Sequence, residues 1–242
     1  MAHRKNSRPI KPRHSSRRAL LAGSPAQDRP EGQRQLDALK QAGGTSLAGL
    51  AAILRDPTHP DALRVTAAWL LGVLEQPAAL APLLAAANDP NPEIRWQGIL
   101  SLGLLRDARA LPSLIDHLAA TADPAVRQII VWAMGCIGGS TAVAELTRLL
   151  TLLTEHPAVR GAAAEQLGMI GNRTAVPVLL AALQDPETEV RFWSAYALGQ
   201  LGVKRAIPAL ESLAKRDTGA VPQFGSIAAE ARQAIQHIRQ GW

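Results

Sequence analysis

The sequence predicts an all-α protein built as a solenoid, in which helix pairs stack in a row. The apolar share is 47% but the aromatic share is only 3%, so the core residues are mainly Ala and Leu, which favour helices. A ten-residue pattern with Arg near its start and Gly at its end recurs along the chain. Turns containing Asp-Pro or His-Pro separate the copies. One helix pair cannot bury its own apolar face, so repeated pairs must stack.

The first segment of the chain is strongly basic. Residues 1–18 hold seven Lys and Arg and no acid, whereas the rest of the chain has 19 basic and 20 acidic residues. We expect residues 1–30 to be a disordered tail, because such a composition cannot bury enough apolar surface to offset its chain entropy. Its predicted roles are weak polyanion contact through residues 1–18, targeting as a transit peptide, or solvation alone. The apolar run Ala19–Ala22 is too short for a secretory signal.

An additional helix is predicted over residues 31–44, where it would cover the open face of the first repeat. The repeats follow, and their first five copies align without gaps. They read LRVTAAWLLG (63–72), IRWQGILSLG (94–103), VRQIIVWAMG (126–135), VRGAAAEQLG (159–168) and VRFWSAYALG (190–199). A degraded sixth copy, IAAEARQAIQ (227–236), follows a longer loop and would close the other end.

A second helix is predicted after each of these glycines. In most copies Pro stands near its start, where the missing N–H costs nothing, at Pro82, Pro112, Pro177 and Pro208. In the third copy Ala144 takes that place. The Asp of each turn is expected to cap the following helix, and the recurrent Gly permits close packing or a C-cap.

This pattern resembles the short HEAT-like repeat first grouped around the phycobilisome lyases, and the resemblance covers residues 46–240. It implies a right-handed, armadillo-like solenoid of five to six repeats over residues 31–242. It also implies that the arginines form a structural ladder with acids of the inter-repeat turns, such as Asp56, Asp89, Asp123 and Asp185. The ladder arginines are Arg64, Arg95, Arg127, Arg160 and Arg191. Proteins with this repeat include scaffolds, adaptors, bilin lyases and a few DNA-binding enzymes.

The few aromatic residues gather on one flank of the repeated helix. Numbered from the first residue of each copy, positions 3, 4, 7 and 11 lie opposite the apolar core stripe. Six of the eight aromatic residues of the chain occupy these positions. We therefore predict an open, aromatic-lined concave groove that binds a protein partner. The candidate binding residues are Trp69, Trp96, Leu100, Trp132, Glu165, Phe192, Trp193 and Tyr196.

The function predicted from these features is a non-catalytic protein-binding scaffold or adaptor, with a partner helix in the groove. The first alternative is a bilin lyase or chromophore-handling subunit, with Glu165 gripping a cationic ligand or pyrrole N–H groups. The second is a nucleic-acid-binding protein, which the groove disfavours because it contains no Lys or Arg. We predict no catalytic, cofactor or metal site, since the histidines are scattered and no Gly-rich phosphate loop is present. A single cysteine, Cys136, and the lack of a long apolar run predict a cytoplasmic protein without a membrane span.

Overall fold

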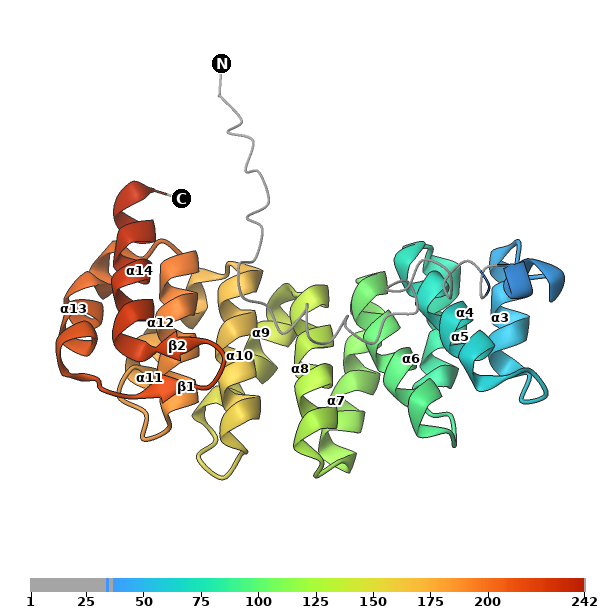
Figure 1. Ribbon diagram of the computed structural model, residues 1–242, viewed down its shortest axis with the longest axis horizontal. Coiled ribbons are helices and arrows are strands. Elements are labelled where there is room, and N and C mark those ends of the chain that lie inside the picture. The colour runs from blue at the N-terminus through green and yellow to red at the C-terminus, as the bar shows by residue number, and fades with distance from the viewer. Residues whose placement is uncertain (1–33, 35–36, 242) are drawn as a thin grey trace, which may run out of the picture.

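The computed structural model describes residue 34 and residues 37–241, which form a row of helix pairs (Figure 1). The odd-numbered helices are α3 (Leu47–Arg55), α5 (Leu80–Ala86), α7 (Leu111–Ala120), α9 (Gly139–Thr151), α11 (Val176–Ala182) and α13 (Ile207–Arg216). The even-numbered helices are α4 (Asp61–Val73), α6 (Pro92–Leu105), α8 (Pro124–Ile137), α10 (Pro157–Ile170), α12 (Thr188–Gln200) and α14 (Ile227–Gln240). The predicted all-α solenoid of helix pairs is confirmed.

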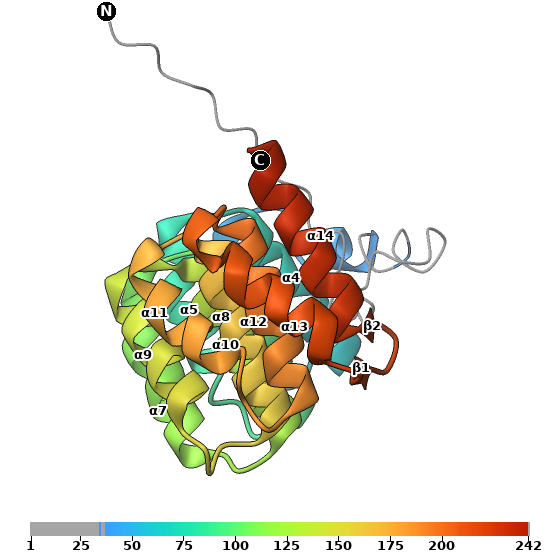
Figure 2. The ribbon, with the colours of Figure 1, turned by 90° about the vertical axis from the view of Figure 1, so that its left-hand side faces the viewer.

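The two sets of helices form two layers. Figure 2, turned to look along the row, shows α7, α9 and α11 stacked along one side of the molecule. Consecutive even helices pack directly on one another from α4 to α14, whereas consecutive odd helices contact each other far less. The closer spacing of the even layer makes it the inner side of the stack.

The Gly that ends the repeat pattern explains this close spacing. A Cβ atom added to Gly72 would lie 2.9 Å from the Cα atom of Ser101 in the next even helix, and one added to Gly168 would lie 2.6 Å from the Cα atom of Ala197. Both distances are too short for any side chain. The recurrent Gly therefore serves close helix packing here, and the C-cap alternative does not apply at these positions.

Proline and polar caps begin the even helices. Pro92, Pro124 and Pro157 are the first residues of α6, α8 and α10. The predicted Asp cap is found at Asp123, whose side chain accepts a hydrogen bond from the backbone N–H of Ala125 at 2.9 Å. Elsewhere the prediction is wrong, because Asn91 caps α6 and His156 caps α10. The turn aspartates that do not cap a helix are instead bound by other groups, described below.

The odd helices start in three ways, and α3 is capped by Ser46, whose side chain accepts a hydrogen bond from the N–H of Gly49 at 3.1 Å. Short 3₁₀ turns precede four of them, namely η2 (Pro77–Ala79), η3 (Ala108–Ala110), η4 (Arg173–Ala175) and η5 (Lys204–Ala206). Helix α9 instead follows α8 at once, through Gly138 and Gly139 with φ values of 70° and 83°. Only glycine adopts two such angles in succession without strain. The centre of the row is thus joined differently from its two halves.

The two ends of the described chain are closed by local elements. Residues 37–41 are helical, and Leu39 among them is buried, as a helix covering the first repeat requires. Residues 42–44 form a turn, so the helix ends three residues before the predicted bound of 44. Residues 31–33 and 35–36 and the basic tail 1–30 lie outside the described residues, and residue 34 is helical. Before α14, the loop forms an antiparallel hairpin of β1 (Ala220–Val221) and β2 (Gly225–Ser226), paired Ala220 with Ser226 and Val221 with Gly225. No described helix is both long and apolar enough to cross a bilayer.

Candidate binding surface

The aromatic residues predicted to line an open groove are mostly buried. Trp132, Trp193 and Tyr196 are each 3% exposed and Phe192 is 1% exposed. Trp69 and Trp96, near the other end of the row, are half-buried. The prediction of an open, aromatic-lined groove is therefore wrong.

Close helix spacing is the physical reason. Trp132 lies against Gly103 of the preceding even helix, where an added Cβ would be 3.0 Å from the indole ring. Trp193 likewise lies against Gly161 of α10, where an added Cβ would be 2.9 Å from the ring. A glycine in one repeat thus accommodates the ring of the next. A helical projection of a single helix places these rings on a free flank because it contains no neighbouring repeat.

Phe192, Trp193 and Tyr196 belong to a packed cluster at the C-terminal end of the even layer. The Trp193 ring meets Phe192 and Tyr196 edge-on, with centroids 5.2 and 5.6 Å apart. Phe224, from the hairpin, contacts Trp193 with centroids 4.9 Å apart. The hairpin therefore covers the cluster, in the edge-to-face geometry that aromatic rings prefer.

Two other predicted groove residues, Leu100 and Glu165, are buried as well. They are 5% and 2% exposed, and Glu165 accepts a hydrogen bond from Gln166 at 3.3 Å. Glu165 therefore does not present its carboxylate to a ligand from solvent, which corrects the role suggested for it. Burial, with the negative charges of Glu165 and Glu230, raises the pKa of Tyr196. Burial alone raises the pKa of Glu230, on α14, to about 7.

The arginine ladder is present, with partners in the following inter-repeat turn. The ion pairs are Arg64–Asp89, Arg127–Glu155, Arg160–Asp185 and Arg191–Asp217. Asp89 and Asp185 were among the predicted acids, whereas Asp56 binds Thr58 and Asp123 caps α8. Each partner lies 25 to 28 residues after its arginine, a spacing in the sequence that could have identified Glu155 and Asp217.

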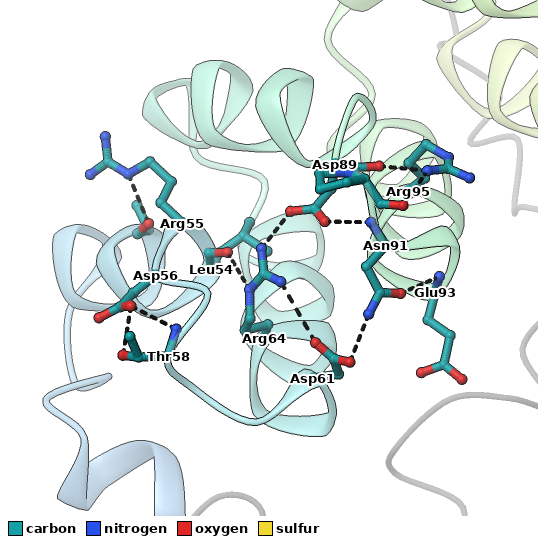
Figure 3. Close-up of polar contacts among 12 residues, drawn as sticks. Leu54, Arg55, Asp56, Thr58, Asp61, Arg64, Asp89, Asn91, Glu93 and Arg95 are labelled. Atoms are coloured by element: carbon teal, nitrogen blue, oxygen red, sulfur yellow. Dashed lines mark hydrogen bonds and ion pairs between the residues drawn. The ribbon is translucent and has the colours of Figure 1, made fainter.

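Figure 3 shows the first rung of the ladder in detail. Arg64 donates through Nε to the carbonyl of Leu54 at 2.9 Å and pairs with Asp89, which also accepts from the N–H of Asn91 at 2.8 Å. Arg95 differs, since it donates to the carbonyls of Asp89 and Pro90 at 2.7 and 2.8 Å. Arg64 thus joins one repeat to the next, while Arg95 fastens the turn that precedes its own helix.

Two of the ladder acids, Glu155 and Asp217, have a lowered pKa. Burial alone would raise the pKa of Glu155, but its ion pair with Arg127 and the N–H of His156 hold that pKa below its usual value. Burial would likewise raise the pKa of Asp217, but its ion pair with Arg191 and the hydrogen bond from the N–H of Gly219 lower it. The rungs are therefore structural ion pairs, not a basic surface for phosphate.

The accessible part of the even layer lies at the ends of its helices. Position 11 falls in the last turn of each helix, and there Val73 is 40% exposed and Met169 42% exposed. Leu104 and Cys136 hold the same position in α6 and α8 and are half-buried. We name these four residues the apolar stripe. Within residues 34 and 37–241, no three His, Cys, Asp or Glu residues are grouped as metal ligands.

Fold and surface together define the class of this protein as a repeat protein whose helix pairs stack into an α-solenoid. A family model of HEAT repeats matches residues 47–135 and 146–229, so the chain belongs to the HEAT-repeat family. The unmatched residues between these segments include the double-glycine junction between α8 and α9.

Several curated proteins are similar to this chain. Phycocyanobilin lyase subunit alpha of Picosynechococcus sp. is 30% identical over 183 residues, which are 69% of this chain and 66% of that protein. Bilin biosynthesis protein PecE of Mastigocladus laminosus is 32% identical over 114 residues, 44% of this chain and 42% of the relative. Human deoxyhypusine hydroxylase is 32% identical over 107 residues, 44% of this chain and 34% of the relative. The chain thus spans less than two thirds of each of these relatives.

Among solved structures, the complex of CpcE and CpcF of phycocyanin lyase from Nostoc sp. PCC7120 is similar over 98% of this chain and 100% of the matched chain. The sequence identity is 18% and the TM-score is 0.46. The resemblance to HEAT-like repeats of the phycobilisome-lyase type is confirmed by the family match and by these relatives.

Proposed function

We propose that this chain is a protein-binding HEAT-repeat subunit of the bilin-lyase type, which acts on a chromophore only together with a protein partner. The observation that carries the proposal is the identity of 30% to a phycocyanobilin lyase subunit over 69% of the chain. The matched solenoid is the surface-presenting part of the chain, since HEAT-like repeats stack into an extended binding surface.

The packing of the rings supports the requirement for a partner. A flat tetrapyrrole needs an apolar cleft with a few polar groups that orient it. Trp132, Trp193 and Tyr196 are closed against neighbouring helices, and Glu165 is buried with them. A bilin would accordingly be held between this chain and a second protein.

Co-expression tests this proposal. The full chain is produced with a phycobiliprotein subunit and phycocyanobilin, with and without a second lyase-type HEAT-repeat protein, and covalent adduct is measured by absorbance and by zinc-enhanced fluorescence in gels. We expect bilin attachment or retention only when both HEAT-repeat proteins are present. Absence of both attachment and retention in every combination would refute a role in bilin handling.

The second candidate function is a protein-binding adaptor without a chromophore. The closed aromatic cluster favours it, because no described ring cluster offers an open face for a flat ligand. Stable binding of a protein partner whose affinity does not change with added bilin would favour the adaptor over the lyase subunit.

A further inference from the structure

The two edges of the even layer differ in charge, since one is mixed and the other carries mainly bases. All even helices run in the same direction, so one edge contains their N-termini and the other their C-termini. The edge at the N-termini carries the exposed acids Asp61, Glu93, Asp123 and Glu187, together with exposed bases at the ends of odd helices, Arg55, Lys215 and Arg216. The edge at the C-termini, here named the basic edge, carries the exposed bases Arg106, Arg109, Arg173, Lys204 and Arg205. Its acids are fewer, namely the exposed Glu75 and the half-buried Asp107, which pairs with Arg109.

Helix dipoles account for part of this distribution, since acids stabilise helix N-termini and bases stabilise C-termini. They do not account for the apolar stripe. Val73, Leu104, Cys136 and Met169 end four consecutive helices, α4 to α10, and the basic residues follow α6, α10 and α12 within a few residues. The basic edge therefore combines partly exposed apolar side chains with a surplus of positive charge.

From this combination we infer that the apolar stripe and the basic edge bind an acidic amphipathic helix of a partner protein. The inference goes beyond the proposed function, because it does not depend on a chromophore. The axes of packed helices lie 8–10 Å apart, so neighbouring even helices place one stripe residue about every 8–10 Å along the row. A helix that crosses them advances about 10.5 Å in seven residues, so one apolar residue per heptad meets one stripe residue. Acids beside that apolar row would meet the basic edge.

Charge argues against other occupants of this surface. The basic segment of residues 1–18 carries seven Lys and Arg, which the basic edge repels. A second copy placed symmetrically would bring two basic edges together. A membrane requires side chains that project into the lipid, whereas Leu104 and Cys136 are half-buried.

The probe is a synthetic, fluorescently labelled helix of about 28 residues, with Leu once per heptad and Glu beside it. A sister peptide carries Lys in place of Glu. Anisotropy titrations with the full chain compare both peptides. We expect the Glu peptide to bind at least tenfold more tightly than the Lys peptide. Equal affinities, or no binding of the Glu peptide at 100 μM protein, would overturn the inference.

Matched variants locate the site on the molecule. Lys204 and Arg205 begin η5 on the basic edge, whereas Lys215 and Arg216 end α13 at the opposite edge, and all four are exposed. The double substitution Lys204→Glu/Arg205→Glu should weaken the Glu peptide about tenfold, while Lys215→Glu/Arg216→Glu should change it less than twofold. Both variants have the same net charge and retain the basic N-terminal segment. Equal losses would show that overall charge, not the basic edge, binds the peptide.

The stripe and the membrane alternative are tested in the same series. Met169→Asp should weaken the Glu peptide at least fivefold, because Met169 is 42% exposed and the substitution both removes an apolar contact and adds a charge that repels the peptide. Met169→Ser, which adds no charge, should weaken it in the same direction; circular dichroism checks that both variants fold, since Met169 also accepts a hydrogen bond from the Tyr196 hydroxyl at 3.8 Å. Co-sedimentation with vesicles of anionic lipid provides the second measurement. Sedimentation of the wild-type chain that Met169→Asp abolishes would assign the stripe to a lipid surface and refute the peptide site.

Discussion

Removal of Arg160 tests how much the ladder contributes to the stability of the row. Its side chain is 3% exposed and that of Asp185, its partner in the next turn, is 6% exposed. Arg160→Ala leaves Asp185 as an uncompensated buried charge, an effect that costs roughly 3–5 kcal/mol. For a chain of this size, each kcal/mol lowers the melting temperature by about 2–4 °C, so we expect a loss of roughly 6–20 °C.

Arg95→Ala is the matched control, since Arg95 holds the same position in its repeat but contacts two backbone carbonyls, with no ion pair among the contacts described. It should cost about 1–2 kcal/mol. Thermal and urea unfolding followed by circular dichroism at 222 nm give both values. A loss for Arg160→Ala no larger than that for Arg95→Ala would refute the view that buried rungs hold consecutive repeats together.

The double variant Arg160→Met/Asp185→Leu separates two effects, the loss of the ion pair and the cost of leaving one buried charge without its partner. Replacing both partners by apolar residues leaves no buried charge, so much of the stability lost in Arg160→Ala should return. A double variant as unstable as the single one would show that the geometry of the turn, including the hydrogen bond from the N–H of Glu187 to Asp185 at 3.0 Å, dominates.

Three further predictions concern the even layer. The pKa of Glu230 is about 7 in the fold and near 4.5 when unfolded, so ionisation destabilises the fold increasingly as pH rises between these values. Glu230→Gln should therefore stabilise the chain by about 3 kcal/mol at pH 8 and by progressively less toward pH 5, measured as melting temperatures of both proteins across pH; a gap that does not change with pH would contradict this. Gly168→Leu should lower the free energy of unfolding by more than about 3 kcal/mol, since the Cβ atom alone would lie 2.6 Å from the Cα atom of Ala197. Gly171→Ala has open space around it but a φ of 78°, so it should lower the same free energy by about 1–2 kcal/mol, measured by urea unfolding. The double variant Trp132→Ala/Trp193→Ala should be unfolded at 37 °C, because the loss of each buried ring costs about 3–5 kcal/mol of stability. If the rings lined an open groove, the double variant would remain folded. A native circular dichroism spectrum of the double variant would therefore show that these rings are exposed.

The ion pairs of the arginine ladder could be predicted only in part before the structure was known. The resemblance to HEAT-like repeats implied inter-repeat pairing of the recurrent Arg, and the pairing is found at four of the five positions. The identity of the acids was only half predicted, because Glu155 and Asp217 stand outside the Asp-Pro pattern that drew attention to the others. The spacing between partners is more regular than the residue types, and it reflects the fixed length of one helix pair.

The burial of the aromatic rings could not be predicted from the sequence. Periodicity placed Trp132, Trp193 and Tyr196 on the flank away from the odd helices, but it could not state how closely the next even helix approaches. That distance depends on contacts between residues about 30 positions apart, such as Gly103 with Trp132 and Gly168 with Ala197. The sequence indicates only a longer loop where the hairpin carries Phe224 onto the cluster, because the paired segments of the hairpin are two residues each.

The sequence by itself determined the repeat, the helix pairs, their order and the positions of the recurrent arginines, because these follow from periodicity and from local helix chemistry. Only the tertiary structure decided which surfaces reach solvent, because exposure depends on the spacing between stacked helices. It buried Trp132, Phe192, Trp193 and Tyr196 of the aromatic flank and left Val73 and Met169, at the helix ends, exposed to solvent.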